Sequence, residues 1–188
     1  TILISFFTVI TGCSNLDIQT LNNKAAELMA KGDIDGAIAR LESIQDLNPN
    51  FPETNYNLGI AYKSKNDYDN ALKYLKRAIK LKPDFPQAHS TVAVINEELA
   101  ENLMKKELLA HEEQNPLEPF SINDSDFSEE KKEKLLSYYT EALISIEDYL
   151  KYSKQTENID IYNQKKEELK NKITELTKEE IETLESSN

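Results

Sequence analysis

The sequence is poor in the residues that most often build catalytic, metal and disulfide sites. It contains one Cys, two His, four Gly and no Trp in 188 residues. A single Cys cannot form a disulfide within the chain, and two isolated His offer neither a metal cluster nor a catalytic relay. Four Gly also leave no glycine-rich loop for phosphate. We therefore expect a protein that is not an enzyme and that uses no cofactor, metal or small-molecule substrate.

Basic residues are scarce relative to acidic ones. The chain has 22 Lys and Arg against 34 Asp and Glu, which gives a formal net charge of −12. This balance argues against a nucleic-acid partner, because phosphates need a basic surface. The hydrophobic content of 39% suits a folded chain. The low Gly and Pro content favours helices, so an all-α fold is expected.

Residues 1–12 form an uncharged, mostly apolar segment. It is too short to cross a bilayer as a helix, which takes about 20 residues, but it has the length of the apolar part of a secretory signal. The segment ends in Ile10-Thr11-Gly12-Cys13, which resembles the lipobox of bacterial lipoproteins. The resemblance implies a signal peptide over 1–12, truncated at its start, and lipidation of Cys13. The alternative is that Cys13 lies buried and inert in a first helix.

An offset of 34 residues relates two parts of the chain, as in repeat proteins. Equivalent residues at this offset are Lys31 and Lys65, Asp33 and Asp67, Ala37 and Ala71, Leu41 and Leu75, and Pro49 and Pro83. Apolar residues within each copy fall three and four apart, as on one face of a helix. The Pro of each copy ends its second helix, because the residue before Pro avoids helical backbone. The pattern predicts two helical hairpins, over 18–51 and 52–85.

The second copy resembles the tetratricopeptide repeat (TPR). It reads Asn55-x₂-Leu58-Gly59-x₂-Tyr62, followed by Ala71-x₃-Leu75 and Pro83, with Asn55 and Leu75 in the places of a Trp and a Phe of the family pattern. The resemblance implies a right-handed, all-α solenoid of helical hairpins. Its structural signature here comprises Ala25, Ala37, Pro49, Leu58, Gly59, Tyr62, Ala71, Ala78 and Pro83.

A third, degenerate hairpin is expected over 86–154. Its first helix starts at Pro86 and continues to about Glu113, twice the usual length, and its second helix starts after Ser128. The segment 155–188 then predicts a capping helix, because one apolar stripe runs along an otherwise charged helix. The stripe consists of Tyr162, Leu169, Ile173 and Leu176. A short coiled coil with a partner helix is the alternative for this stripe.

Residues 112–130 form an acidic loop region with seven acidic residues and no basic one: Glu112, Glu113, Glu118, Asp124, Asp126, Glu129 and Glu130. One interpretation is a solvated loop that keeps the protein soluble. The other is a docking site that attracts a basic partner. The segment lacks the Gly and the final Glu of an EF-hand calcium loop.

The first helices of successive hairpins line a groove for peptides or helices in the TPR family. By register, the groove-facing residues here are Asn22, Met29, Tyr56, Ile60, Lys63, Asp67, Ser90, Val94 and Glu97. This mixture of aromatic, aliphatic and polar groups suits the capture of a peptide. The Lys and Asn pattern of the carboxylate-clamp members is absent, so their activity is not implied.

The two resemblances together imply an exported TPR lipoprotein that binds a protein or peptide partner. Such proteins assist the assembly of a cell-envelope complex of the pilus, secretion or outer-membrane type. A linker over 13–17 would hold the groove close to the membrane, which is the outer membrane facing the periplasm if the host has two membranes. The alternatives are a self-associating structural envelope protein and an accessory subunit of an envelope enzyme.

Overall fold

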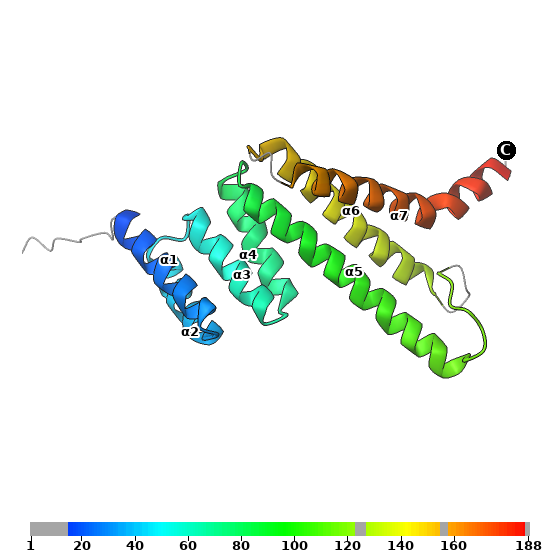
Figure 1. The fold of residues 1–188 in the computed structure, drawn as a ribbon, viewed down its shortest axis with the longest axis horizontal. Helices are drawn as coiled ribbons and strands as arrows, with labels where there is room; N and C mark the ends of the chain where they lie inside the picture. The colour runs from blue at the N-terminus through cyan, green and yellow to red at the C-terminus, as the bar shows by residue number, and fades with distance from the viewer. Residues whose placement is uncertain (1–14, 123–126, 155–157, 187–188) are drawn as a thin grey trace, which may run out of the picture. The chain divides into compact units, whose positions relative to one another are not determined.

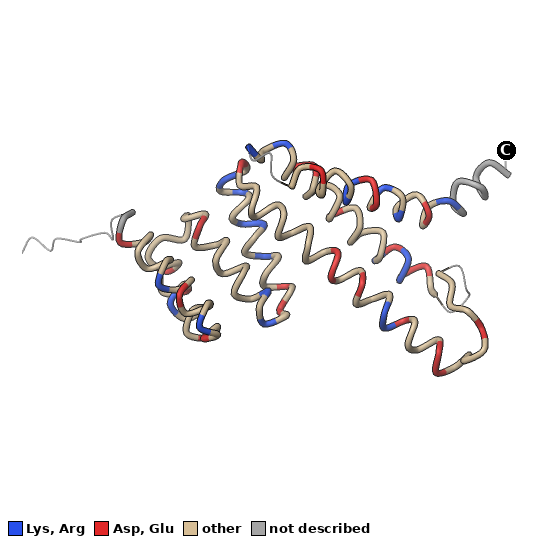
Figure 2. Tube along the Cα trace, viewed as in Figure 1, with Lys and Arg blue, Asp and Glu red and all other residues tan. Residues whose placement is uncertain are grey.

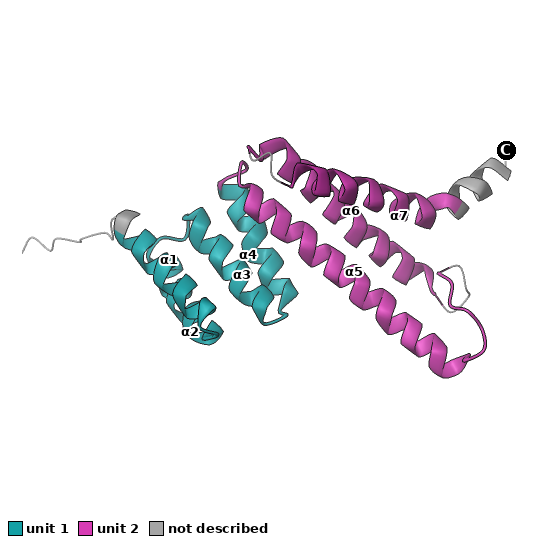
Figure 3. Cartoon of the chain, in the orientation of Figure 1, with its two compact units in different colours: residues 1–81 teal, residues 82–188 magenta. Residues whose placement is uncertain are grey.

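The computed structural model describes residues 15–122, 127–154 and 158–186, and all secondary structure in these ranges is helical (Figure 1). The chain divides into two compact units, residues 1–81 and 82–188 (Figure 3). Unit 1 holds α1 (Asn15–Ala30), α2 (Ile34–Leu47), α3 (Pro52–Ser64) and α4 (Tyr68–Leu81), and unit 2 holds α5 (Pro86–Gln114), α6 (Glu129–Tyr152) and α7 (Ile159–Ser186). The expected all-α class is confirmed.

The 34-residue offset of the sequence reappears in the hydrogen bonds of the two turns of unit 1. After α1, the N–H of Gly32 donates to the Met29 carbonyl and the N–H of Asp33 to the Leu28 carbonyl, both at 2.9 Å. After α3, the N–H of Asn66 donates to the Lys63 carbonyl and that of Asp67 to the Tyr62 carbonyl. Both turns are therefore Schellman motifs, in which Gly32 (φ 82°) and Asn66 (φ 58°) supply the left-handed backbone.

The second helix of each hairpin then starts at an aspartate. Asp33 Oδ1 accepts a hydrogen bond from the N–H of Gly36 at 3.0 Å, and Asp67 Oδ1 accepts one from the N–H of Asn70 at 3.1 Å. Each carboxylate satisfies a backbone donor that has no partner within its helix. Asp33 and Asp67, which are equivalent at the 34-residue offset, thus cap equivalent helices.

Unit 1 has its own hydrophobic core between the four helices. Ala25, Ala37, Leu41, Ile44 and Leu58 are completely buried there. The start of α1 differs from the expected linker over 13–17, since helix already begins at Asn15. Asp17 lies in this first turn, where a negative charge interacts favourably with the helix dipole. The leader and Cys13 lie outside the described residues.

Unit 2 is a long hairpin with a third helix. The 29-residue helix α5 packs against α6, which packs in turn against α7, and Figure 1 shows α7 running along α6. The apolar stripe of α7 faces this hairpin: Leu169 is buried, and Tyr162, Ile173 and Leu176 pack against the same core cluster as Ala93, Ala142 and Ile146. The stripe expected for a capping helix is thus covered by the chain itself.

Acidic and basic residues occur together on each helix (Figure 2). Opposite charges form ion pairs one helical turn apart, such as Lys172 with Glu168 at 2.6 Å and Lys132 with Glu129 at 3.0 Å. Such exposed pairs contribute roughly 0.3–0.5 kcal/mol each. None of the described helices combines the length and the apolar character that a membrane span requires.

Candidate functional site

The face of α3 expected to line the groove is partly open to solvent. Tyr56, Ile60 and Lys63 are each partly exposed. Their spacing of four and three residues places them on one side of the helix. Met29 of α1 is also partly buried and packs against the core of unit 1. Unit 1 therefore presents an aromatic, an aliphatic and a basic side chain together.

Asn22 is not part of this open face, contrary to the expectation from register. Only 3% of its surface is exposed. Its Nδ2 donates to the Ile18 carbonyl at 3.0 Å and to Thr54 Oγ1 at 2.8 Å, and its Oδ1 accepts from Asn57 Nδ2 at 3.0 Å. The physical reason for the difference is that a buried amide must be hydrogen-bonded. Asn22 meets this need by joining α1 to α3.

Asp67 performs a structural task at the edge of the same region. Besides capping α4 through its Oδ1, it accepts a hydrogen bond from the Asn70 side chain at 2.8 Å. The Asn70 side chain and backbone N–H together hold the pKa of Asp67 below its usual value. The carboxylate is thus already engaged by its own helix.

The groove residues expected from the third hairpin lie on α5, in unit 2. Ser90 and Val94 are partly exposed, and the Ser90 hydroxyl donates to the Gln87 carbonyl of its own helix. Glu97 forms an ion pair with Lys165 of α7, and its carboxylate is only 19% exposed. Glu97 therefore has a counter-ion from α7 of the same unit, and its place in a groove stays a prediction.

The residues of the structural signature lie mostly inside the hairpins. Ala25, Ala37, Leu58, Ala71 and Ala78 are completely buried. A Cβ on Gly59 would lie 2.5 Å from Leu75 Cγ and 3.2 Å from the Ala71 carbonyl oxygen. The absence of a side chain at Gly59 therefore allows α3 and α4 to approach each other.

The remaining signature residues lie at the helix ends and on the surface. Pro49 and Pro83 follow the last residues of α2 and α4, Leu47 and Leu81. Tyr62 stacks on Tyr74, with ring centroids 5.5 Å apart, and its hydroxyl donates to Glu42 at 3.0 Å. Burial and the neighbouring Glu42 carboxylate raise the pKa of Tyr62 to about 12. Tyr62 thus links α3 to α2 and α4.

The acidic region 112–130 is attached to unit 2 by aromatic residues. Phe127 is buried, Phe120 packs beside it with ring centroids 6.1 Å apart, and His111 contacts the edge of Phe120. Its described acidic residues, which are Glu112, Glu113, Glu118, Glu129 and Glu130, are all exposed. Asp124 and Asp126 lie outside the described residues. The region therefore combines an anchored aromatic part with a solvated acidic one.

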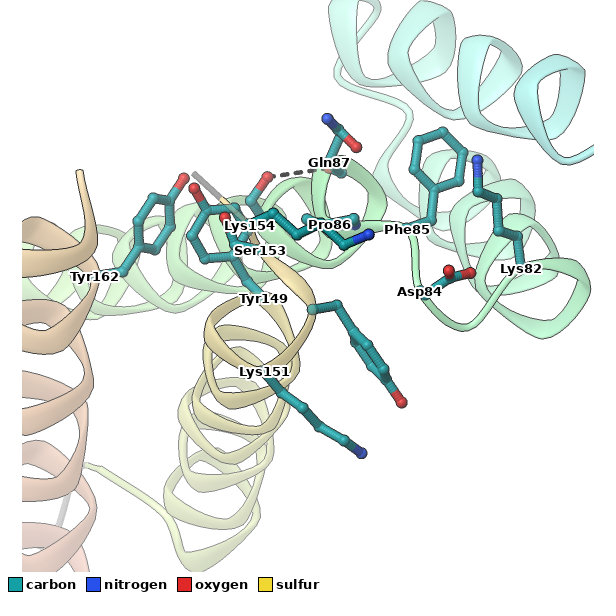
Figure 4. Close-up of a pocket in the computed structure, with 12 residues that line it drawn as sticks. Lys82, Asp84, Phe85, Pro86, Gln87, Tyr149, Lys151, Ser153, Lys154 and Tyr162 are labelled. Carbon is teal, nitrogen blue, oxygen red and sulfur yellow. Dashed lines mark hydrogen bonds between the residues drawn. The ribbon is translucent and has the colours of Figure 1, made fainter. Parts of the chain in front are cut away.

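Unit 2 also contains a pocket that sequence reasoning did not find. Its volume is about 700 Å³, and it is lined by Lys82, Asp84, Phe85, Pro86, Gln87, Ser90, Tyr149, Lys151, Tyr152, Ser153, Lys154 and Tyr162 (Figure 4). These residues come from the turn before α5 and its first turns, the end of α6 and the start of α7. The only sequence signal is a mixture of basic and aromatic residues in two segments that lie about 65 residues apart.

The buried His89 fixes one wall of this pocket. Its Nε2 lies 2.8 Å from the Pro83 carbonyl, so Nε2 must carry the proton of this hydrogen bond. Its ring stacks on Tyr152, with centroids 5.7 Å apart, and its Nδ1 lies 3.7 Å from Asp148. His89 thereby ties the turn before α5 to the end of α6. Within the described ranges, no group of three His, Cys, Asp or Glu side chains is placed to hold a metal ion.

Comparisons with known proteins agree with the repeat pattern. Residues 28–95 match the family model described as tetratricopeptide repeat. No curated protein sequence matches the chain. A candidate protein-binding protein from Bacteroides ovatus ATCC 8483 has a similar solved structure, with a TM-score of 0.62, 16% identity, and coverage of 92% of this chain and 79% of that one.

Another similar structure is SycD, the type III secretion translocator chaperone of Yersinia enterocolitica. Its TM-score is 0.49 at 12% identity, with coverage of 89% of this chain and 88% of that one. Likeness at these identities concerns the fold alone. The family match begins near the end of α1, includes α2, α3 and α4, and ends within α5. Residues 28–95 of this all-α chain therefore resemble the tetratricopeptide repeat.

Proposed function

We propose that this protein is a binding scaffold that holds a protein partner on the first-helix face of its repeats. The observation that carries this proposal is the partly exposed set of Tyr56, Ile60 and Lys63 on one side of α3. An aromatic and an aliphatic group beside a cation suit a peptide with apolar anchors. The description of the B. ovatus protein as a protein-binding candidate is in keeping with this role.

Crosslinking in the native cell tests the scaffold. A photoreactive p-benzoylphenylalanine in place of Tyr56 should give a discrete crosslinked protein, because the side chain lies on the proposed contact face. The matched control places the same residue at Arg77, an exposed position on α4, and should not give this product. The Ile60→Glu substitution should weaken the crosslink from position 56. Identical products from both positions, or none from position 56, would contradict the proposal.

We further propose that the scaffold is an exported lipoprotein that assists the assembly of a cell-envelope complex. The support is the apolar segment 1–12 followed by Gly12-Cys13-Ser14. Acyl chains on Cys13 would bind a bilayer with about 0.8 kcal/mol per buried CH₂. Since α1 begins at Asn15, one residue, Ser14, lies between the anchor and the first helix, and the two residue steps from Cys13 to Asn15 span at most about 7 Å.

Mass spectrometry of the mature amino terminus tests the anchor. The expected species starts at Cys13 and carries acyl chains, and it fractionates with membranes. A Cys13→Ser variant should keep the segment 1–12 and gain no lipid mass. Recovery of the unsubstituted chain with residues 1–12 attached and an unmodified Cys13 thiol would refute the lipoprotein proposal, while leaving the crosslinking result unaffected.

A further inference from the structure

The residues that line the pocket of unit 2 have a net charge opposite in sign to that of the whole chain. Three lysines and one aspartate line it, so its lining carries a net charge of +2, whereas the whole chain carries −12. The lysines come from two sides: Lys82 precedes α5, and Lys151 and Lys154 lie at and just after the end of α6 (Figure 4). Nearby acidic groups are Asp148, beside His89, and the exposed Asp160 at the start of α7. The pocket is a local cationic site on an acidic protein.

Aromatic rings form much of the remaining lining of the pocket, and two of the lysine ammonium groups lie over such rings. Lys82 Nζ lies 4.8 Å from the centroid of the Phe85 ring, and Lys151 Nζ lies 4.7 Å from that of Tyr152. An ammonium above a ring is attracted by the negative face of the ring. Tyr149 and Tyr162 contact each other, with ring centroids 3.9 Å apart. The wall therefore offers apolar area beside the ammonium groups.

Local contacts hold this arrangement in place without a ligand. Tyr149 and Phe85 are 7% and 8% exposed, and His89 bonds the Pro83 carbonyl while it stacks on Tyr152. Residues whose side chains are packed lose little conformational entropy when a ligand binds. The pocket is thus preorganised, and its open volume of about 700 Å³ can hold several residues of a peptide.

We infer that this pocket binds an extended acidic segment of a partner protein, with an aromatic or aliphatic side chain against the tyrosine rings and carboxylates on the lysines. Ammonium groups on opposite sides of the pocket match several separate carboxylates better than one compact anion. The lysines of the pocket attract such a segment, whereas the acidic surfaces of this chain of net charge −12 repel it. The site lies wholly in unit 2 and is independent of the α3 face.

Fluorescence anisotropy with a defined probe tests the inference. The probe is a labelled 12-residue peptide of alternating Glu and Ser with one central Phe, titrated with the full chain. We expect saturable binding that weakens with salt, because screening reduces interactions between exposed charges. A second peptide with Gln in place of each Glu should bind at least about tenfold more weakly, in line with the loss of several ion pairs.

Two double substitutions that remove the same charge distinguish binding in the pocket from a general effect of the charge of the protein. The double substitution Lys151→Gln and Lys154→Gln should weaken the acidic probe about tenfold. Lys105→Gln with Lys106→Gln removes the same charge from exposed positions on α5 and should leave binding within about twofold. Both pairs are exposed, so circular dichroism should show an intact fold in each variant.

Several results would overturn the inference. These are absence of saturable binding by the acidic peptide, equal losses for the two lysine pairs, or tighter binding of a single-stranded oligonucleotide or of anionic vesicles than of the peptide. Crosslinking from position 56 should be unchanged by the Lys151 and Lys154 substitutions. Failure of the inference about the cationic pocket and failure of the proposal about the α3 face therefore give different results.

Discussion

Replacing Leu75 with alanine is expected to lower the free energy of unfolding by about 2–5 kcal/mol, the range for a buried leucine. Leu75 is completely buried. Its side chain lies over Gly59, where a Cβ would be only 2.5 Å from Leu75 Cγ. Gly59 has no side-chain atoms that could move into the space, so the cavity left by the substitution should persist.

Urea unfolding followed by circular dichroism measures this loss. The matched control is Leu47→Ala on α2, because Leu47 is 64% exposed and its substitution should change the free energy by less than about 0.5 kcal/mol. If Leu75→Ala and Leu47→Ala lower the free energy of unfolding equally, the close packing of α3 on α4 at Leu75 does not contribute to stability as we describe.

The second large loss of stability is expected on substitution of Asn55, which stands where the TPR pattern has a Trp. Asn55 is completely buried. Its Nδ2 donates to the Phe51 carbonyl at 2.9 Å and the Pro49 carbonyl at 3.3 Å, and its Oδ1 accepts from Gln45 Nε2 at 2.9 Å. Asn55→Ala removes all three bonds and should cost about 2–3 kcal/mol, because buried polar groups lose their partners.

A second substitution distinguishes hydrogen bonding from packing at this position. Asn55→Asp preserves the shape and the acceptor for Gln45 but cannot donate to the two carbonyls when ionised, so it should destabilise the protein as well. Asn23→Ala, at an exposed position on α1, serves as the control and should change stability by less than about 0.5 kcal/mol. A stability of Asn55→Asp equal to that of the parent chain would show that the donated bonds contribute little.

The features that could be predicted from the sequence are those with a local cause. Pro52 and Pro86 start helices, and Gly32 and Asn66 end them, because each acts through its own backbone. The 34-residue offset located the two hairpins because their turns form equivalent local hydrogen bonds. The long α5 was also predictable, since no Gly or Pro interrupts residues 87–114.

The features that were missed depend on contacts between distant segments. The register of α1 placed Asn22 toward the groove, but its amide meets Thr54 and Asn57, which are more than 30 residues away. Glu97 meets Lys165 across 68 positions. The pocket of unit 2 likewise needs the turn before α5 to reach the end of α6. Hydrophobic periodicity contains no information about such pairs.

The charged outer side of α7 has a consequence for the association of copies of this chain. Glu167 and Lys170 form an exposed ion pair with an N–O distance of 3.1 Å, and Glu168 is also exposed. A hairpin from a second molecule could stack there only by dehydrating these charges, which costs several kcal/mol per ion. These exposed charges of α7 therefore disfavour the stacking of a second hairpin on this part of the helix.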